Sequence, residues 1–132
     1  MRALRKVSMV AGIAAIVTLS LAPQAQASQN SGWVYTSNLS GAVYFDADLN
    51  GYPGVEKITV CDNKTDGRGV TGEVVGQDGS GTVRYIITDP SNDGHCESMQ
   101  GNYFLEDTPV NVFVSESWGS NSAHPGAGTG VA

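Results

Sequence analysis

Residues 69–88 have the sequence GVTGEVVGQDGSGTVRYIIT, in which two segments of alternating apolar and polar residues flank the dipeptide Asp78-Gly79. In the second segment Val83, Tyr85 and Ile87 stand two positions apart, so they share one face of a strand. An Asp-Gly dipeptide between two such segments is a strong signal for a β-hairpin, because both residue types accept the backbone conformations of a tight hairpin turn. This stretch therefore predicts an antiparallel hairpin with one buried face and one solvated face.

The same pattern of strand-like runs and turn dipeptides continues on both sides of the hairpin. Asn-Gly or Asp-Gly stands at residues 50–51, 66–67 and 93–94, and valines alternate with other residues over residues 110–114. These turn signals at short intervals are typical of antiparallel β proteins. Outside the hairpin, the predicted strands are residues 42–46, 55–62, 103–105 and 110–116.

The composition supports the same fold class. The 132 residues include 17 Gly, and 15% of the residues are charged, which suits one domain built from short strands and turns. No segment of the sequence has the apolar stripe of an amphipathic helix. We predict an all-β fold, a small antiparallel sandwich or barrel of about six to seven strands.

The N-terminal segment has the features of a secretory signal peptide. Three basic residues lie within the first six positions, residues 7–21 are uncharged and largely apolar, and Ala25-Gln26-Ala27 places small residues where a signal peptidase cleaves. The apolar run is shorter than the ~20 residues that a membrane-spanning helix needs. We therefore expect a signal peptide at residues 1–27, cleavage after Ala27, and a freely secreted, extracellular protein.

The rest of the chain divides into three parts by composition. Residues 28–40 form a polar lead-in, whose pairing as a first short strand the pattern leaves open, and residues 41–118 contain the predicted β domain. Residues 119–132 are rich in Gly, Ser and Ala, and we predict a flexible tail there. Trp118, at the start of this tail, either closes the end of the core or serves as a platform for a ligand.

The chain has two cysteines, Cys61 and Cys96. In an oxidising extracellular setting an even number of cysteines favours disulfide formation, so we predict one intramolecular bridge. Such a bridge stabilises a small domain by roughly 3–4 kcal/mol in the chain-entropy picture. The sequence has no Cys-x-x-Cys pair that would favour a structural zinc site instead.

The predicted mature chain is strongly acidic. Removal of residues 1–27 leaves four basic and 13 acidic residues, a formal net charge of −9. A surface of this sign repels phosphate backbones and anionic lipid headgroups, so we expect neither nucleic acid nor a membrane surface as a partner. The carboxylates suit a cationic partner or divalent cations, or they serve solubility alone.

One loop has a weak resemblance to a calcium site. Asp46, Asp48 and Asn50 alternate before Gly51, and oxygen-bearing side chains at alternate positions of a loop can converge on Ca²⁺. The next acid, Glu56, comes one residue too early to close an EF-hand loop. Calcium binding between two strands and an acidic β-turn without metal are the two alternatives. We expect no other cofactor.

The sequence offers little for catalysis. His95 precedes a cysteine in a predicted turn and His124 lies in the predicted tail, so neither is well placed as a general base. No Gly-x-Ser-x-Gly, His-Glu-x-x-His or phosphate-binding loop motif occurs. We expect no enzyme; a catalytic site would require a cleft that contains His95 or a pair of carboxylates with shifted pKa values.

Two short motifs resemble those of a known group of proteins. Residues 61–70 read CDNKTDGRGV and residues 92–98 read NDGHCES, which contain Cys-Asp-x-Lys-x-Asp-Gly and Asp-Gly-x-Cys. At this spacing behind a signal peptide they resemble the motifs of small secreted β proteins of Streptomyces and related actinomycetes, a largely uncharacterised group. The resemblance covers most of residues 41–116 and implies an exported β domain with one disulfide joining the two motifs. It implies no catalytic residues and does not include the loop at residues 46–51.

Two functions fit these observations. The first is an extracellular binding or interaction module for an unknown protein or polymer, in which loops and strands present Tyr35, Tyr44, Tyr52 and Trp118. The alternative is a secreted inhibitor of proteases or other hydrolases. Such inhibitors insert a rigid loop beside a disulfide into an active site, and residues 89–96 are the candidate loop.

Overall fold

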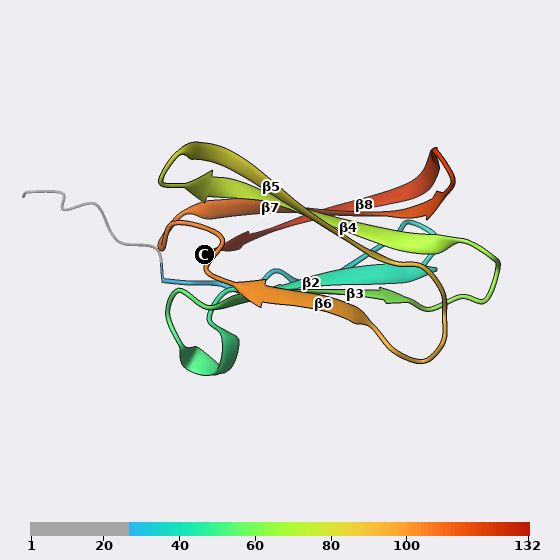
Figure 1. Ribbon diagram of the computed structural model, residues 1–132, viewed down its shortest axis with the longest axis horizontal. Helices are drawn as coiled ribbons and strands as arrows, with labels where there is room; N and C mark the ends of the chain where they lie inside the picture. The colour runs from blue at the N-terminus through green and yellow to red at the C-terminus, as the bar shows by residue number, and fades with distance from the viewer. Residues whose placement is uncertain (1–26) are drawn as a thin grey trace, which may run out of the picture.

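Two antiparallel four-stranded sheets pack face to face as a β-sandwich in the computed structural model, which describes residues 27–132 (Figure 1). The first sheet has the strand order β1-β2-β3-β6 and the second has the order β5-β4-β7-β8. The predicted all-β fold class is confirmed, with eight strands rather than six to seven. The elements are β1 (Gly32–Tyr35), β2 (Gly41–Asp46), the 3₁₀ turn η1 (Leu49–Gly51), β3 (Glu56–Asp62), β4 (Gly69–Asp78), β5 (Gly81–Asp89), β6 (Glu97–Gly101), β7 (Pro109–Trp118) and β8 (Asn121–Val131).

The predicted signal peptide lies outside the described residues except for its last position, Ala27. Within the part of the chain that the structure describes, no helix has the length and hydropathy needed to cross a membrane.

The hairpin predicted from residues 69–88 is present as β4 and β5. The two strands pair from Val70 and Asp89 to Asp78 and Gly81. The Asp78 carboxylate closes the turn, because its Oδ1 accepts hydrogen bonds from the backbone N–H groups of Ser80 and Gly81 at 2.7 and 3.0 Å. An aspartate side chain that satisfies the turn backbone in this way explains why the Asp-Gly signal was reliable here.

The core lies between the sheets and is built mainly from β-branched and aromatic residues. The predicted inward row of β7 is confirmed, since Val110, Val112 and Val114 are all buried. Val83, Tyr85 and Ile87 of β5 are partly buried and pack against the same core. Opposite them, the first sheet contributes mainly Val43, Phe45, Ile58 and Val60.

The strand predicted at residues 103–105 is wrong. The strand is instead β6, whose sequence Glu-Ser-Met-Gln-Gly is mostly polar because an edge strand buries little of its surface. Phe104 does enter the core, but from a loop whose Leu105 N–H bonds to the Gln77 carbonyl at 2.8 Å. Gly76 makes room for the ring, since a Cβ there would lie 2.5 Å from Phe104 Cδ1.

The flexible tail predicted at residues 119–132 is also wrong, because most of it forms β8. This strand pairs with β7 along its length and ends with Val131 buried. Gly126, Gly128 and Gly130 repeat every second residue and face β1 and the segment before it. A Cβ on Gly128 would lie 2.5 Å from Val34 Cγ2, and one on Gly126 would collide with the Tyr35 carbonyl. The glycines are therefore needed where β8 lies close to β1 and the segment before it. The prediction of a flexible tail was based on the high Gly content alone.

The polar lead-in at residues 28–40 contains β1, which the sequence had left open. Its residues pair with β2 from Gly32 opposite Phe45 to Tyr35 opposite Ala42. Just before β1, Gln29 forms a backbone bridge with Val131, at the end of β8. The first and last strands of the described chain thus contact each other along one side of the sandwich.

Candidate functional site

The outer face of the first sheet carries a row of aromatic side chains. Because side chains alternate along a strand, Trp33 and Tyr35 project from one face of β1 while Val34 is buried on the other. The register places Trp33 opposite Tyr44 of β2, with their ring centroids 5.3 Å apart. Trp33 and Tyr35 are 46% and 48% exposed, so both rings are open to a partner.

These rings border a surface hollow of about 200 Å³, here called the aromatic groove. The register brings Tyr35 opposite Ala42 and Ala42 opposite Cys61, so these side chains share the outer face. Ala42 and Cys61 are nevertheless buried, which shows that their neighbours on this face cover them and that they form its floor. The residues that line the aromatic groove are Trp33, Tyr35, Ala42, Cys61 and Asn63.

The backbone under the aromatic groove is held on both sides. β2 pairs with β1 on one side, and on the other Gly126 of β8 approaches the Tyr35 carbonyl while Gly128 approaches the Val34 side chain. The Tyr44 hydroxyl also accepts a hydrogen bond from Asn30 Nδ2 at 2.9 Å. A site on strands held in this way is more rigid than a site on a free loop.

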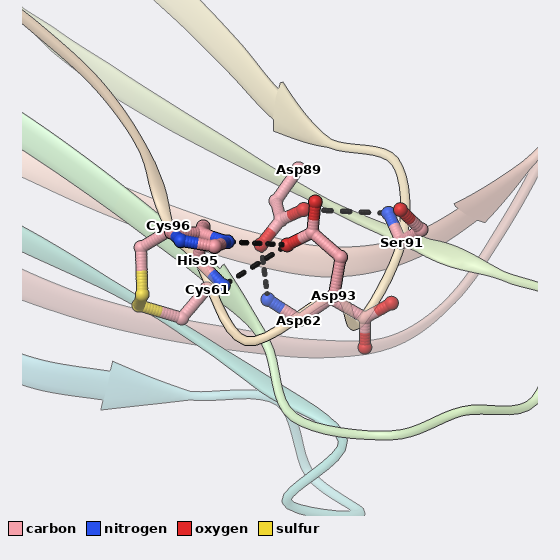
Figure 2. The surroundings of a disulfide bond; sticks show 7 residues. All are labelled: Cys61, Asp62, Asp89, Ser91, Asp93, His95 and Cys96. Carbon is pink, nitrogen blue, oxygen red and sulfur yellow. Dashed lines mark hydrogen bonds and ion pairs between the residues drawn. A yellow bond between two sulfur atoms is a disulfide. The ribbon is translucent and has the colours of Figure 1, made fainter.

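The predicted disulfide is confirmed and lies beside the aromatic groove. Cys61, near the end of β3, is bonded to Cys96, immediately before β6 (Figure 2). The bond links the end of β3, an inner strand of the first sheet, to the segment that arrives from β5 in the second sheet. It thereby joins the two sequence motifs that contain the cysteines.

The segment between β5 and β6, residues 90–96, forms an exposed loop that is anchored at both ends, here called the bridged loop. At one end Asp89 is buried, and its Oδ2 accepts the Asp62 N–H at 2.7 Å while its Oδ1 accepts the Ser91 N–H at 3.3 Å. At the other end Cys96 is held by the disulfide. Between them, Asp93 Oδ1 accepts the His95 N–H at 2.9 Å (Figure 2).

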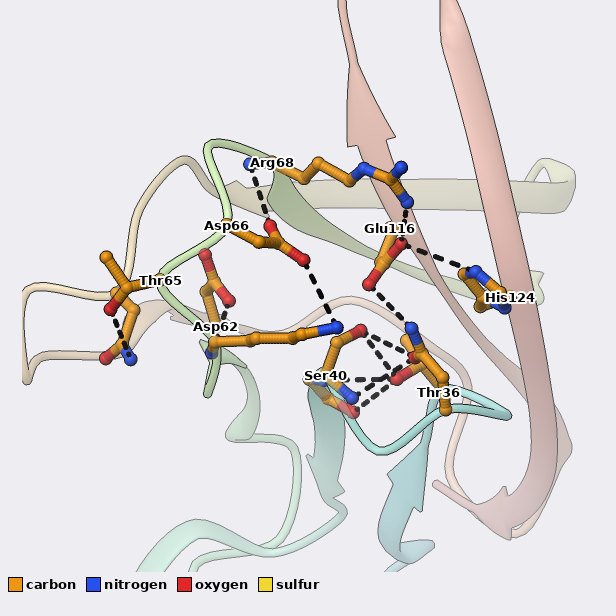
Figure 3. A network of polar contacts seen from close by, with 12 residues as sticks. Thr36, Ser40, Asp62, Thr65, Asp66, Arg68, Glu116 and His124 are labelled. Carbon is orange, nitrogen blue, oxygen red and sulfur yellow. Dashed lines mark hydrogen bonds and ion pairs between the residues drawn. The ribbon is translucent and has the colours of Figure 1, made fainter.

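A polar network occupies the same end of the sandwich and centres on Glu116, a buried residue of β7 (Figure 3). Its Oε1 accepts a hydrogen bond from Asn38 Nδ2 at 2.8 Å, and its Oε2 accepts one from Arg68 Nη1 at 2.7 Å. The Ser40 hydroxyl, the Asn38 amide and the Arg68 guanidinium lower the pKa of Glu116 to about 2. Glu116 is therefore an ionised residue that ties the loop before β2 to β4 and β7, here called the Glu116 network.

Trp118 and His124 belong to the surroundings of this network. The Arg68 guanidinium carbon lies 4.2 Å from the centroid of the Trp118 ring, a cation–π contact. His124 lies at a β-bulge in β8, and its Nε2 is 3.8 Å from Glu116 Oε2. Trp118 packs over Arg68 and lines a surface hollow with Ser117 and Gly119. Its two predicted roles, a cap on the core and a ligand platform, stay predictions.

Asp62, next to Cys61, is also buried, and only one of its two carboxylate oxygens is hydrogen-bonded. Asp62 Oδ1 accepts the Lys64 N–H at 2.9 Å, but Oδ2 is buried without a hydrogen-bond partner. Burial raises the pKa of Asp62, and the nearby carboxylates of Asp89, Asp66 and Glu116 add to this effect. The acidic residues of the 61–67 motif therefore serve mainly to arrange the backbone around the bridge.

Glu56, at the start of β3, is a fourth buried acid and lies at the opposite end of the strand from Asp62. Its Oε2 accepts the Tyr103 N–H at 2.7 Å, while its Oε1 is buried without a partner. Burial raises the pKa of Glu56, opposed by this backbone hydrogen bond. Glu56 thus fixes the loop that carries Phe104 into the core.

The residues of the predicted calcium loop lie between β2 and β3. Asp46 ends β2 opposite Lys57, Asp48 makes no capping hydrogen bond to η1, and Asn50 has a positive φ of 58°. Asp48 Oδ1 is buried without a hydrogen-bond partner. Across residues 27–132, no three His, Cys, Asp or Glu side chains are arranged to hold a metal ion. Asn50 is outside that set of residue types, so calcium binding by Asp46, Asp48 and Asn50 stays a prediction.

The four aromatic residues named as binding candidates do not gather at one place. Tyr35 and Tyr44 lie on the outer face of the first sheet, whereas Tyr52 is exposed in the loop after η1 and Trp118 lies against Arg68. Trp33 and Asn63 were not predicted as site residues from the sequence. The alternation of Trp33, Val34 and Tyr35 was the available signal, because it places two rings on one face of a strand and an aliphatic residue on the other.

In comparisons with known proteins, no family model, curated protein or solved structure matches the chain.

Proposed function

We propose that this domain is an extracellular binding module and that the aromatic groove is its ligand surface. The observation that supports this most directly is that Trp33 and Tyr35 line a hollow on one face of a sheet, with Tyr44 packed against Trp33 on the same face. Single exposed apolar residues are ordinary on protein surfaces, but adjacent exposed rings beside a hollow are typical of recognition sites. Aromatic side chains also bury much area at a small cost in side-chain entropy, so they are effective in binding.

The signal peptide features and the resemblance to secreted actinomycete proteins support export, and the disulfide is compatible with it. The predicted net charge of −9 supports a partner other than nucleic acid or an anionic membrane. We propose a binding role rather than an enzymatic one because the strongly perturbed acids have structural partners. Glu116 is ionised and paired with Arg68, and Glu56 holds the loop at Tyr103.

The test is co-sedimentation of the purified, exported protein with the insoluble extracellular material of the producing culture. We expect the wild-type protein to sediment with this material and the Trp33→Ala and Tyr35→Ala variants to remain in solution. Phe113→Ala is the matched control, because Phe113 is 41% exposed on the other sheet. Equal sedimentation of all four proteins would contradict a role for the aromatic groove.

A second candidate function, inhibition of an extracellular hydrolase, is favoured by the bridged loop. Residues 90–96 are all exposed, and the loop is anchored by Asp89 at one end and by the disulfide at the other. A loop that is rigid before binding loses little conformational entropy in a protease active site. Assays against serine, cysteine and metalloproteases and glycosidases test this role. Inhibition that is lost when residues 91–94 are replaced by Gly-Ser would support it, and no inhibition at micromolar concentration would contradict it.

A further inference from the structure

We infer that the aromatic groove binds a neutral carbohydrate, with one sugar ring of an extracellular polysaccharide stacked on Trp33 or Tyr35. This inference rests on the proposed binding function and names its ligand class. Four properties of the groove lead to it: its lack of charge, its size, the pairing of apolar walls with a polar rim, and its rigid backbone.

The lining of the aromatic groove contains no ionisable acid or base apart from the Tyr35 phenol. Trp33, Ala42 and Asn63 are uncharged, and Cys61 is in a disulfide and does not titrate. A site for an anionic or cationic ligand would offer an opposite charge, since binding partners are electrostatically complementary. The formal net charge of −9 on the predicted mature chain further disfavours acidic polymers as ligands. The ligand chemistry that fits is therefore neutral.

The size of the groove restricts the ligand to a small unit. Its volume of about 200 Å³ lies below the ~300–1,000 Å³ typical of pockets for whole drug-sized ligands. Trp33 and Tyr35 are two residues apart on one strand, which separates their Cα atoms by about 7 Å. One sugar ring fits this space, and the open sides of the groove let the rest of a polymer continue across the sheet.

The walls and rim of the groove match the two surfaces of a sugar. The C–H bonds on one face of a pyranose ring carry a small positive charge and pack on the negative face of an aromatic ring, by the same electrostatics that orient aromatic pairs. The hydroxyl groups at the ring edge both donate and accept hydrogen bonds. The Asn63 amide and the Tyr35 hydroxyl also donate and accept, and both side chains are exposed at the groove.

The backbone of the groove is arranged before any ligand arrives. β1 lies between its partner β2 and the glycines of β8, so Trp33 and Tyr35 keep their relative positions. The disulfide holds Cys61 on the floor. Weak stacking contacts give useful affinity only when little entropy is lost on binding, which this rigidity provides.

A proline-rich peptide is the main competing ligand, because such peptides also dock on aromatic-lined grooves. Proline lacks a backbone N–H and offers only carbonyl acceptors. It would therefore leave the acceptor oxygens of Asn63 and Tyr35 without a hydrogen-bond donor. The single hollow also gives one contact point, whereas an extended peptide uses several successive ones. The observations therefore favour the sugar.

The test is an NMR titration that follows the indole N–H signals of the two tryptophans, Trp33 and Trp118. The exported protein is titrated with neutral oligosaccharides of β-1,4-linked glucose, N-acetylglucosamine, xylose and mannose, and separately with a proline-rich peptide. We expect at least one oligosaccharide to shift the Trp33 signal saturably, while Trp118 serves as the internal reference. In calorimetric titrations, which do not depend on the Trp33 signal, Trp33→Ala should weaken binding at least tenfold, Asn63→Ala should weaken it less, and Phe113→Ala should leave it unchanged.

The outcomes separate this inference from the proposed function. If the peptide shifts Trp33 and no oligosaccharide does, the carbohydrate inference is overturned and the binding function stands. If nothing in the panel shifts Trp33, the carbohydrate inference is overturned as well, and the sedimentation experiment decides the binding function independently. Thermal unfolding of each variant shows whether a loss of binding reflects a loss of fold.

Discussion

Arg68 and Glu116 form an ion pair in which the Arg68 side chain is exposed to solvent and the Glu116 side chain is buried. The Nη1–Oε2 distance is 2.7 Å, and the two side chains are 39% and 1% exposed. A buried carboxylate is tolerated only when its oxygens are hydrogen-bonded, and here both are. The pair therefore holds strand β7 to the start of β4 at the end of the sandwich that also contains the disulfide.

Glu116→Gln tests the strength of this network. Glutamine keeps the size of the side chain but loses the charge and one acceptor oxygen, so we expect the free energy of unfolding to fall by about 1–3 kcal/mol. Urea denaturation at neutral pH measures it. The control is Glu73→Gln, which removes an exposed pair with Arg84 and should cost less than about 1 kcal/mol. Equal losses would show that burial adds nothing to the Glu116 network.

The dependence of stability on pH should have two opposite parts. Glu56 has a pKa raised above 4.5 in the folded protein, so acidification from neutral pH protonates the folded state first, and stability rises until the pH reaches about 4.5. Glu116 has a folded pKa of about 2, so its contribution is complete above 4.5 and is lost between pH 4.5 and about 2.

Urea midpoints between pH 7 and pH 2.5 measure both parts. Glu56→Gln should reduce the rise, to which Asp62 also contributes because its pKa is raised as well, and Glu116→Gln should reduce the fall. A wild-type midpoint that declines steadily from pH 7 would contradict the assignment to Glu56.

Removal of the disulfide should lower stability without changing the topology. The bond closes a loop between cysteines 35 positions apart, and the loss expected for Cys61→Ser with Cys96→Ser is about 2–5 kcal/mol. Calorimetric unfolding measures the loss. Reduced wild-type protein should match the double variant, and a larger deficit in the variant would point to packing of the Cys61 side chain instead.

The close approach of β8 to β1 predicts a specific glycine effect. Gly126→Ala places a methyl group against the Tyr35 carbonyl, and we expect a loss of about 1–3 kcal/mol because the two backbones must separate. Gly79→Ala is the control, since a Cβ there has open space around it. Hydrogen exchange should become faster in β1 for the first variant alone. Unchanged exchange in β1 would mean that β1 does not depend on this contact.

The calcium prediction for Asp46, Asp48 and Asn50 is tested by thermal unfolding. A ligand that binds only the folded state stabilises it by RT ln(1 + [L]/Kd), so millimolar Ca²⁺ after EDTA treatment should raise the midpoint by several degrees. Asp48→Asn should abolish the rise. A midpoint that is the same in EDTA and in Ca²⁺ would assign these residues to the turn alone.

The sequence was sufficient for the parts of the fold that follow strict alternation. The hairpin of β4 and β5 and the buried row Val110, Val112 and Val114 could be predicted because one face of each strand is apolar. β6 could not, because an edge strand with one inward methionine, Met99, has almost no apolar pattern. β8 was mistaken for a tail because its inward positions are glycines, whose role depends on β1 lying against them.

The candidate site was predictable only in part for a related reason. Tyr35 and Tyr44 were recognised as exposed aromatics, but the groove needs the register of three strands to bring Tyr35, Ala42 and Cys61 side by side. Pairing between segments distant in sequence is not encoded in local spacing. The disulfide was predictable because the chain has only two cysteines and the pairing has one solution.

The contact between the two ends of the described chain also determines when the protein can fold. Gln29 bonds to Val131, and Ala132 is buried with its carbonyl accepting the Asp107 N–H at 2.6 Å. Until β8 has been synthesised, β1 lacks the glycines that pack against it and β7 lacks one of its two partner strands. Folding of the sandwich is therefore expected to wait for β8 and, because the β3–β6 and β4–β7 pairings join distant segments, to be slow on the scale of helical domains.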